Sequence, residues 1–305
     1  MTPKTLFRHT LASFAFVMSG SLMAAEPVVV SSKIDTEGSV MGPMVLQSLE
    51  GAGIPVENRL QLGGTSIVRN AIKAGEIDIY PEYTGNAAFF HDQADRDIWK
   101  DAGKAYQEAA RLDKEAHNIV WLEPAEANNT WAMSVRGDLA RENNLATLED
   151  LARYINEGGS FKFAASAEFV ESASALPAFQ EAYGFKLESD QLLILSGGNT
   201  AATLRAAALN NNDVNCAMTY GTDGGLDAQD LKVMEDNAGV QPVYQPSPIV
   251  RGEVLETYPQ IREVLTPIFE SLDLETLQRL NGQVAVNGVP ADTVARDSLD
   301  SLAQD

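Results

Sequence analysis

Four aromatic residues lie at expected turns of the chain and not at the periodic positions of a helix or strand: Tyr83, Trp131, Tyr220 and Tyr244. The face of an aromatic ring carries a negative quadrupole. Several rings around one site therefore attract a cation that cannot form hydrogen bonds, with about 0.5–2 kcal/mol from each desolvated ring. Any one of these rings taken alone is better explained by burial in a core. Their shared location at strand ends and chain crossings instead predicts a site for a quaternary ammonium group.

The aromatic turns follow apolar strands. A strand over residues 77–80 runs into Pro81, which cannot continue a central hydrogen-bond ladder, so the chain is expected to turn there. Gly85 is expected to supply a backbone conformation that other residues avoid. Residues 213–225 repeat the arrangement, with Tyr220 between an apolar strand and a glycine-rich turn. Because open α/β sheets bind ligands at the carboxyl ends of their strands, the two turns predict a cleft between two lobes.

The order of predicted elements indicates two α/β units. Strands and helices alternate from residue 28 to residue 80 and, after a crossing at residues 124–131, again from residue 132 to residue 220. A proline-rich return at residues 241–248 precedes two or three helices that are expected to pack on the first unit. We therefore predict an α/β fold of two lobes, each a mixed β-sheet flanked by helices, joined by two hinge crossings. The predicted boundaries are lobe I over residues 26–128 plus 246–305, and an inserted lobe II over residues 129–245.

The first 25 residues have the layout of a secretory signal peptide. Lys4 and Arg8 precede an apolar run over residues 11–23, and Ala24 and Ala25 offer a small-residue cleavage point. The alternative, an N-terminal membrane anchor, is less favoured because the run is shorter than the roughly 20 apolar residues that a span needs. We expect cleavage to release a free, monomeric protein into the periplasm.

The mature chain is expected to be strongly acidic. Its formal net charge changes from −21 to −23 when Lys4 and Arg8 leave with the signal peptide, which argues against nucleic acid as a partner. Cys216 is the only cysteine, so no intramolecular disulfide can form, and we interpret it as a small buried hydrophobe. His91 and His117 lie far apart in the sequence, without an acidic partner at ligand spacing, which argues against a metal site.

Enzyme signatures are missing from the sequence. It has no Gly-x-Ser-x-Gly, no His-Glu-x-x-His and no phosphate loop. The turn at Gly197 and Gly198 could hold an anion on its N–H groups, although such a turn is usually only a turn. An enzyme acting on a choline-like compound stays open as an alternative, with Glu37, Glu82 and Asp223 as its candidate acids and bases. We expect a protein that binds a small molecule without transforming it and that needs no cofactor.

Five motifs occur in a characteristic order: Lys33-Ile34-Asp35-Thr36-Glu37, Asp78-Ile79-Tyr80-Pro81-Glu82-Tyr83-Thr84-Gly85, Asn129-Thr130-Trp131, Tyr220-Gly221-Thr222-Asp223-Gly224 and Pro242-Val243-Tyr244-Gln245-Pro246-Ser247-Pro248. With them, the chain from about Val28 to Leu302 resembles the periplasmic substrate-binding proteins of ABC importers for osmoprotectants. The resemblance implies a type II binding protein whose two lobes close on glycine betaine or a related quaternary amine. It also implies docking on ABC permease subunits in the inner membrane under osmotic stress. Choline or another cation as the ligand, and a role as the ligand-sensing partner of a membrane receptor, stay open.

The resemblance also implies roles for the aromatic residues. The cage tyrosines of the family fall on Tyr83, Tyr220 and Tyr244, and a fourth aromatic falls on Trp131, where relatives often have tyrosine. The larger indole is expected to offer the better face for a cation.

The anionic end of the ligand is where this chain departs from the family. In relatives the carboxylate is held by a lysine that matches Lys33, a threonine that matches Asn86, and an arginine whose place is taken by Ser172. A serine offers one neutral donor where an arginine makes two charge-assisted hydrogen bonds. We therefore expect modest affinity for glycine betaine and a weak preference for it over choline, with Lys33 as the only nearby positive charge. Arg69 or Arg205 could replace the arginine, but both are expected at solvated positions of helices.

Overall fold

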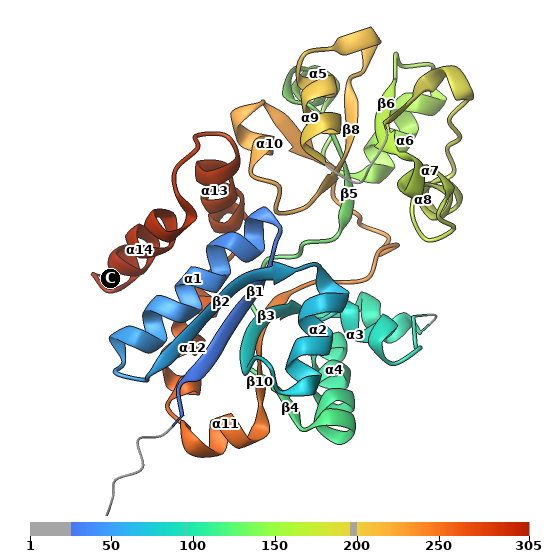
Figure 1. Ribbon diagram of the computed structural model, residues 1–305. Coiled ribbons are helices and arrows are strands. Elements are labelled where there is room, and N and C mark those ends of the chain that lie inside the picture. The colour runs from blue at the N-terminus through green and yellow to red at the C-terminus, as the bar shows by residue number, and fades with distance from the viewer. Residues whose placement is uncertain (1–25, 95, 196–199, 305) are drawn as a thin grey trace, which may run out of the picture.

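The computed structural model describes residues 26–94, 96–195 and 200–304. Within them, two five-stranded sheets form two lobes, which lie one above the other in Figure 1. We call the lobe built on sheet β2-β1-β3-β10-β4 lobe I and the one built on sheet β7-β6-β8-β5-β9 lobe II. The predicted signal peptide, residues 1–25, and the predicted turn at residues 196–199 lie outside the described residues.

Both sheets follow one plan. In each, three neighbouring strands are parallel, and the next strand, β10 or β5, runs antiparallel to both of its neighbours. That strand is the first one formed after the chain crosses between the lobes, so the crossing itself makes each sheet mixed, as predicted. The strands of lobe I are β1 (Val28–Lys33), β2 (Val56–Gly63), β3 (Ile79–Tyr83), β4 (Ile119–Trp121) and β10 (Pro246–Arg251). Those of lobe II are β5 (Trp131–Arg136), β6 (Phe163–Ser166), β7 (Leu192–Leu195), β8 (Cys216–Tyr220) and β9 (Leu231–Val233).

Helices cover both faces of each sheet, so that each lobe has two apolar cores. The helices of lobe I are α1 (Thr36–Gly51), α2 (Thr65–Ala74), α3 (Asn86–Phe90), α4 (Ala102–His117), α11 (Gly252–Thr257), α12 (Ile261–Glu270), α13 (Leu274–Ala285) and α14 (Ala291–Leu302), with a 3-10 turn at Asp97–Lys100. Those of lobe II are α5 (Gly137–Asn143), α6 (Leu148–Asn156), α7 (Ala167–Glu171), α8 (Leu176–Tyr183), α9 (Thr200–Ala208) and α10 (Gly225–Ala228), with 3-10 turns at Ser189–Gln191 and Asn211–Asp213. Among the described helices, none combines the length and the apolar character that crossing a membrane requires.

The chain passes between the sheets twice, at residues 122–130 and 234–245. The two crossings are bonded to each other: the hydroxyl of Thr130 donates to the carbonyl of Pro242 at 2.8 Å, and the N–H of Tyr244 donates to the side chain of Asn128 at 2.8 Å. This pairing places Tyr244 and the start of β5 at the same point between the lobes.

The C-terminal helices pack on lobe I, as expected, and α13 also reaches lobe II. Its Asn281 donates to the carbonyl of Thr222 at 2.9 Å, and its Gln278 donates to the carbonyl of Gly221 at 2.7 Å. A Cβ atom at Gly224 would lie 2.1 Å from the backbone nitrogen of Gly282, so the two backbones touch with no side chain between them. The lobes therefore meet at a third place besides the two crossings.

Two expectations about the turn after β3 are wrong. The strand does not end at Pro81 but continues to Tyr83, with Pro81 opposite Pro248 of β10. Neither proline has an N–H, so this pair needs no ladder hydrogen bond and the strand is not interrupted. Gly85 has an ordinary right-handed backbone, with φ −64°. A glycine is needed there because a Cβ atom would lie 2.8 Å from the ring of Tyr244.

Candidate functional site

A cavity of about 840 Å³ lies between the lobes. It opens where strands end: Lys33, Tyr83 and Tyr220 are the last residues of β1, β3 and β8, and Trp131 is the first residue of β5. Both lobes and both crossings contribute to its wall. The seven residues of the predicted ligand set all line it: Lys33, Tyr83, Asn86, Trp131, Ser172, Tyr220 and Tyr244.

The four predicted cage rings come from three parts of the fold. Trp131 and Tyr220 face each other across the β5–β8 ladder, and Trp131 packs edge-on against Phe169 with ring centroids 5.7 Å apart. Tyr244 comes from the second crossing, where its ring lies on Gly85. Tyr83 enters from lobe I. The ladder, the crossing and the strand thus bring together rings that are up to 161 residues apart in sequence.

The phenols of the cavity are held in their neutral form. Burial raises the pKa of Tyr244 to about 12 and also raises the pKa of Tyr220. Burial, together with the charge of Glu37, raises the pKa of Tyr83 well above its ordinary value. At neutral pH these rings therefore offer a cation the quadrupole of a neutral phenol.

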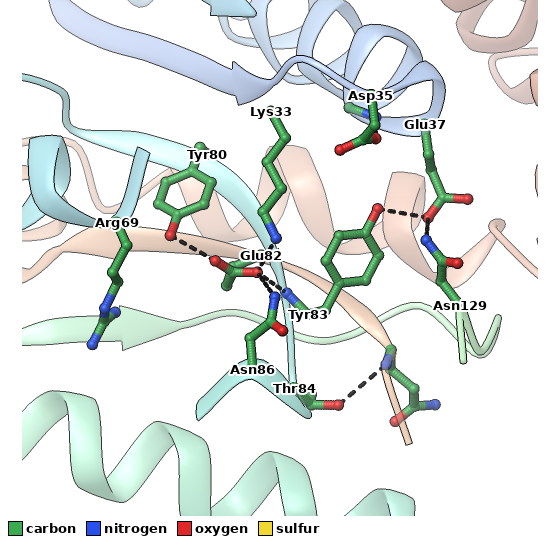
Figure 2. Close-up of polar contacts among 12 residues, drawn as sticks. Lys33, Asp35, Glu37, Arg69, Tyr80, Glu82, Tyr83, Thr84, Asn86 and Asn129 are labelled. Carbon is green, nitrogen blue, oxygen red and sulfur yellow. Dashed lines mark hydrogen bonds and ion pairs between the residues drawn. The ribbon is translucent and has the colours of Figure 1, made fainter. Parts of the chain in front are cut away.

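Lys33 is not a free positive charge, which corrects the expectation from the sequence. Its ammonium group forms a buried ion pair with Glu82. The same carboxylate accepts hydrogen bonds from the hydroxyl of Tyr80 at 2.8 Å, from the N–H of Tyr83 at 2.7 Å and from the amide of Asn86 at 2.7 Å (Figure 2). Two of the three residues that the resemblance assigned to a ligand carboxylate, Lys33 and Asn86, are thus already bonded to a carboxylate of the protein. The Nζ atom of Lys33 also lies 4.5 Å from the centroid of the Tyr83 ring and covers one of its faces.

The place of the family arginine is polar and uncharged. Ser172 follows the last residue of α7, and its hydroxyl lies 3.0 Å from that of Ser174. Arg205 is exposed on α9, as expected. Arg69 is not solvated, contrary to expectation: it is buried, forms a two-point ion pair with Asp113 and stacks on the ring of Phe90. Neither arginine reaches the cavity.

The lining of the cavity is acidic. Among its described residues Lys33 is the only basic side chain, and its charge is balanced by Glu82. Four acidic residues also line the cavity: Asp35, Glu37, Glu168 and Asp223. This charge distribution favours a cation and leaves a ligand carboxylate without a free basic partner.

Glu37 is a site residue whose setting the sequence did not reveal. Asp35 caps the start of α1 by accepting the N–H of Gly38 at 2.7 Å, and this places Glu37 in the first turn, facing the cavity. Burial raises its pKa to about 7, although hydrogen bonds from neighbouring groups favour the carboxylate. One donor to it, Asn281, comes from α13, and no sequence signal had pointed to that residue.

His91 and His117 lie together, away from the cavity. The rings of His91 and His117 stack with centroids 6.4 Å apart, and the Nε2 atom of His91 lies 2.7 Å from the carboxylate of Asp113. This pairing corrects the view that they lack an acidic partner. No cluster of three or more His, Cys, Asp or Glu side chains suited to a metal ion occurs in the described part of the chain. Cys216 is buried, as predicted, and the predicted anion turn at Gly197 and Gly198 lies outside the described residues.

Comparison with known proteins identifies the family. Residues 26–301 match the substrate-binding domain of ABC-type glycine betaine transport systems. The chain belongs to this family. Its members are the substrate-binding components of transporters and not enzymes, so the enzyme alternative is set aside.

Two relatives and one solved structure illustrate the similarity. The glycine betaine-binding protein YehZ of Escherichia coli is 55% identical over 278 residues, which cover 91% of each chain. The glycine-betaine-binding protein of Pseudomonas aeruginosa is 31% identical over 300 residues, 96% of this chain and 94% of the relative. A solved structure of apo YehZ matches with a TM-score of 0.85 and 54% identity, over 91% of this chain and 99% of that one. This match confirms the predicted two-lobed binding-protein fold.

Proposed function

We propose that this protein is the substrate-binding component of an ABC importer and captures glycine betaine or a related quaternary amine between its lobes. Lobe I spans residues 26–128 plus 246–305, and lobe II spans residues 129–245. The observation that carries the proposal is the convergence of four rings on one acidic cavity. Rings and carboxylates together attract a methylated ammonium group, which has no N–H for a hydrogen bond.

The ligand-binding roles of the individual residues form part of this proposal. Trp131, Tyr83, Tyr220 and Tyr244 contact the trimethylammonium group. Lys33, Asn86 and Ser172 lie where the other end of the ligand fits, although Lys33 and Asn86 also bond to Glu82. Closure of the lobes removes water from the rings, and the loaded protein then docks on the permease in the inner membrane. The protein is exported by cleavage near residue 25 and acts in the periplasm as a monomer in osmoprotection.

Choline is the second candidate ligand, and a specific observation favours it. The described wall of the cavity holds no basic side chain that is free of a protein carboxylate. Choline has the same trimethylammonium group as glycine betaine but carries a hydroxyl in place of the carboxylate, so it needs no such partner.

The test is calorimetric titration of the protein with glycine betaine, choline, carnitine and proline betaine. We expect saturable binding of at least one of them, with one site per chain. If none of the four binds at millimolar concentration, the proposed function is wrong.

A further inference from the structure

Glu37 is a buried carboxylate without a counter-charge. The residue is 4% exposed, and its side chain lines the cavity. Its Oε1 atom accepts the hydroxyl of Tyr83 at 2.8 Å and the amide of Asn129 at 3.2 Å, and its Oε2 atom accepts the amide of Asn281 at 2.8 Å (Figure 2 shows the first two). The side chain of Thr222 is a further hydrogen-bond donor to it. All of these donors are neutral, and no lysine, arginine or histidine of the described residues forms an ion pair with it.

The side-chain amides of Asn129 and Asn281, which donate to Glu37, each leave their oxygen without a hydrogen bond. The Oδ1 atoms of Asn129 and Asn281 are buried and have no hydrogen-bond partner, because both amides turn their NH2 groups toward the carboxylate. A buried acceptor without a donor costs free energy. A proton on Glu37 would supply a donor that the oxygen of Asn129 could accept after a half-turn of its amide, whereas the amide of Asn281 is also held by the carbonyl of Thr222. The surroundings of Glu37 are therefore compatible with both of its protonation states.

The nearest possible counter-charge inside the protein is already used. Lys33 pairs with Glu82 and does not approach Glu37 within ion-pair distance. Tyr83, one of the four proposed cage rings, donates its hydroxyl to Glu37 directly. A cation held against that ring thus lies beside the one cavity carboxylate that is both buried and hydrogen-bonded to the cage.

We propose that Glu37 is the counter-anion of the bound cation, and that the positive charge of the ligand displaces a proton from Glu37 into the solvent when it binds. This inference rests on the proposed function, because it concerns the same cavity and ligand class. The exchange is balanced in charge: one cation enters the cavity and one proton leaves it. Glu37 thereby makes the affinity depend on pH and favours a ligand with net positive charge over a zwitterion.

The other ionisable groups around Glu37 differ from it in setting, and the Glu37→Gln variant separates their contribution from its own. Asp35, on the same turn, is exposed and raises the pKa of Glu37 by repulsion. From lobe I, Lys33 and Glu82 neutralise each other, and Tyr83 has a pKa well above its ordinary value. From lobe II, Asp223 accepts hydrogen bonds from Thr200, Thr219 and the N–H of Tyr220, which favour its carboxylate form, but burial raises its pKa as well. Burial places the pKa of Glu37 at about 7 without a ligand, where the exchange can be measured.

The test is calorimetric titration with tetramethylammonium chloride, which carries a fixed charge and no titratable group. Titrations between about pH 5.5 and 8.5, each in two buffers of different ionisation enthalpy, give the number of protons released. We expect more than half a proton per ligand at pH 6.5, and a Kd that falls by up to about tenfold per pH unit below pH 7 and levels off above pH 8. Choline should behave in the same way, and its uncharged carbon isostere 3,3-dimethylbutan-1-ol should not bind more tightly as the pH rises.

Two variants assign the effect. Glu37→Gln keeps the shape of the side chain and should abolish both the proton release and the pH dependence. Asp35→Asn is the matched control: it removes one negative charge from the same turn, and asparagine can still cap α1, so the slope with pH should persist. If Glu37→Gln does not fold, ¹³C NMR of the wild type gives a second test. The carboxyl signal that titrates near pH 7 in the ligand-free protein should have its titration midpoint at lower pH after addition of tetramethylammonium.

The outcomes are distinguishable. Binding of tetramethylammonium with a constant Kd and no proton release overturns the role of Glu37 and leaves the proposed function intact. A pH dependence that persists unchanged in Glu37→Gln also overturns it. Failure of every quaternary amine to bind at any pH overturns the proposed function itself, and this inference with it.

Discussion

Lys33 and Glu82 form an ion pair at the lobe I side of the cavity, with side-chain exposures of 5% and 0%. The pair joins Lys33 of β1 to Glu82 of β3, and the amide of Asn86 donates to the same carboxylate. The protein thus supplies its own carboxylate at the position where the resemblance places the carboxylate of a ligand. A ligand with an anionic end must either share these donors or bind without them.

The first prediction concerns the cage. Tyr220→Ala should weaken binding of glycine betaine or choline by more than tenfold, about 1.4 kcal/mol, because it removes one desolvated ring face. Phenylalanine should substitute in part, since the face and not the hydroxyl supplies the attraction. Calorimetry measures the affinity. Tyr154→Ala, a lobe II tyrosine that does not line the cavity, is the control and should leave the affinity unchanged. Unchanged affinity in Tyr220→Ala would place the ring outside the site.

Trp131 needs a different design because it also packs on Phe169. Trp131→Ala should weaken binding by more than tenfold and also lower the melting temperature, since it uncovers part of the lobe II core. Trp131→Tyr keeps an aromatic face at this position and should recover most of the affinity. A Trp131→Ala protein that is less stable yet binds normally would show that the indole serves the core alone.

The second prediction concerns the missing arginine. Ser172→Arg should tighten glycine betaine binding by an order of magnitude or more and should not help choline, because a guanidinium can hold a carboxylate through two hydrogen bonds. Ser174→Arg is the matched control: it adds the same charge to the cavity wall two residues away. Equal gains in both variants would indicate a general charge effect. No gain in either would mean that the carboxylate lies elsewhere or that the new arginine pairs with Glu168.

The third prediction concerns the internal carboxylate. Glu82→Gln leaves Lys33 buried without a counter-charge and should lower the free energy of unfolding by about 3 kcal/mol or more. Glycine betaine can then offer its carboxylate to Lys33, so saturating glycine betaine should restore more of the melting temperature than saturating choline does. Glu57→Gln, which breaks the half-exposed pair with Arg59, is the control and should change little. Equal rescue by both ligands would contradict the idea that Glu82 occupies the carboxylate position.

The fourth prediction concerns stability without a ligand. The pKa of Glu37 is raised from 4.5 to about 7 in the folded protein. The folded state therefore binds a proton more tightly than the unfolded state, and stability falls as the pH rises from about 4.5 to 7, by roughly 3 kcal/mol for this group. Denaturant unfolding at pH 5 and pH 8 should show this loss in the wild type and a smaller one in Glu37→Gln. The same pH profile in both proteins would show that Glu37 is ionised at no cost.

The fifth prediction concerns export. The mature protein isolated from the periplasm should begin near Glu26, as N-terminal sequencing can check. Recovery of a chain that begins at Met1 from the membrane fraction would instead support the anchor.

The course of the chain could be predicted because it depends on local patterns. The predicted alternation of strands and helices between residues 132 and 220 is present, and so are the predicted C-terminal helices. The strand Leu192–Leu195 and the helices Leu176–Tyr183 and Ala291–Leu302 are examples, because each is an apolar or amphipathic run. The amphipathic run from Ile98 to Glu115 is divided in the structure, because Asp101 caps a new helix by accepting the N–H of Lys104. A cap within a charged, amphipathic run is difficult to detect from spacing alone.

Contacts between distant segments were the part that the sequence could not provide. Pro81 resembles a strand end in the sequence because its partner across the ladder, Pro248, lies 167 residues later. A solvated position is predicted for Arg69 because its ion-pair partner, Asp113, is distant in the sequence. The lining residues themselves were predictable from motifs, whereas the partners that fix their charge, Glu82 for Lys33 and Asn281 for Glu37, depend on how the strands and α13 assemble.

The contact between Gly224 and Gly282 limits how the lobes can move. The two adjacent crossings form a flexible hinge, which only weakly resists bending or twisting of one lobe relative to the other. A third contact, made backbone to backbone with no deformable side chain between, resists the torsion while it is intact. The motion of the lobes that remains easy is a hinge bend in one plane. A single methyl group at position 224 would separate the two backbones at this contact. It would be expected to bias the protein toward an open, empty form without touching a cage residue.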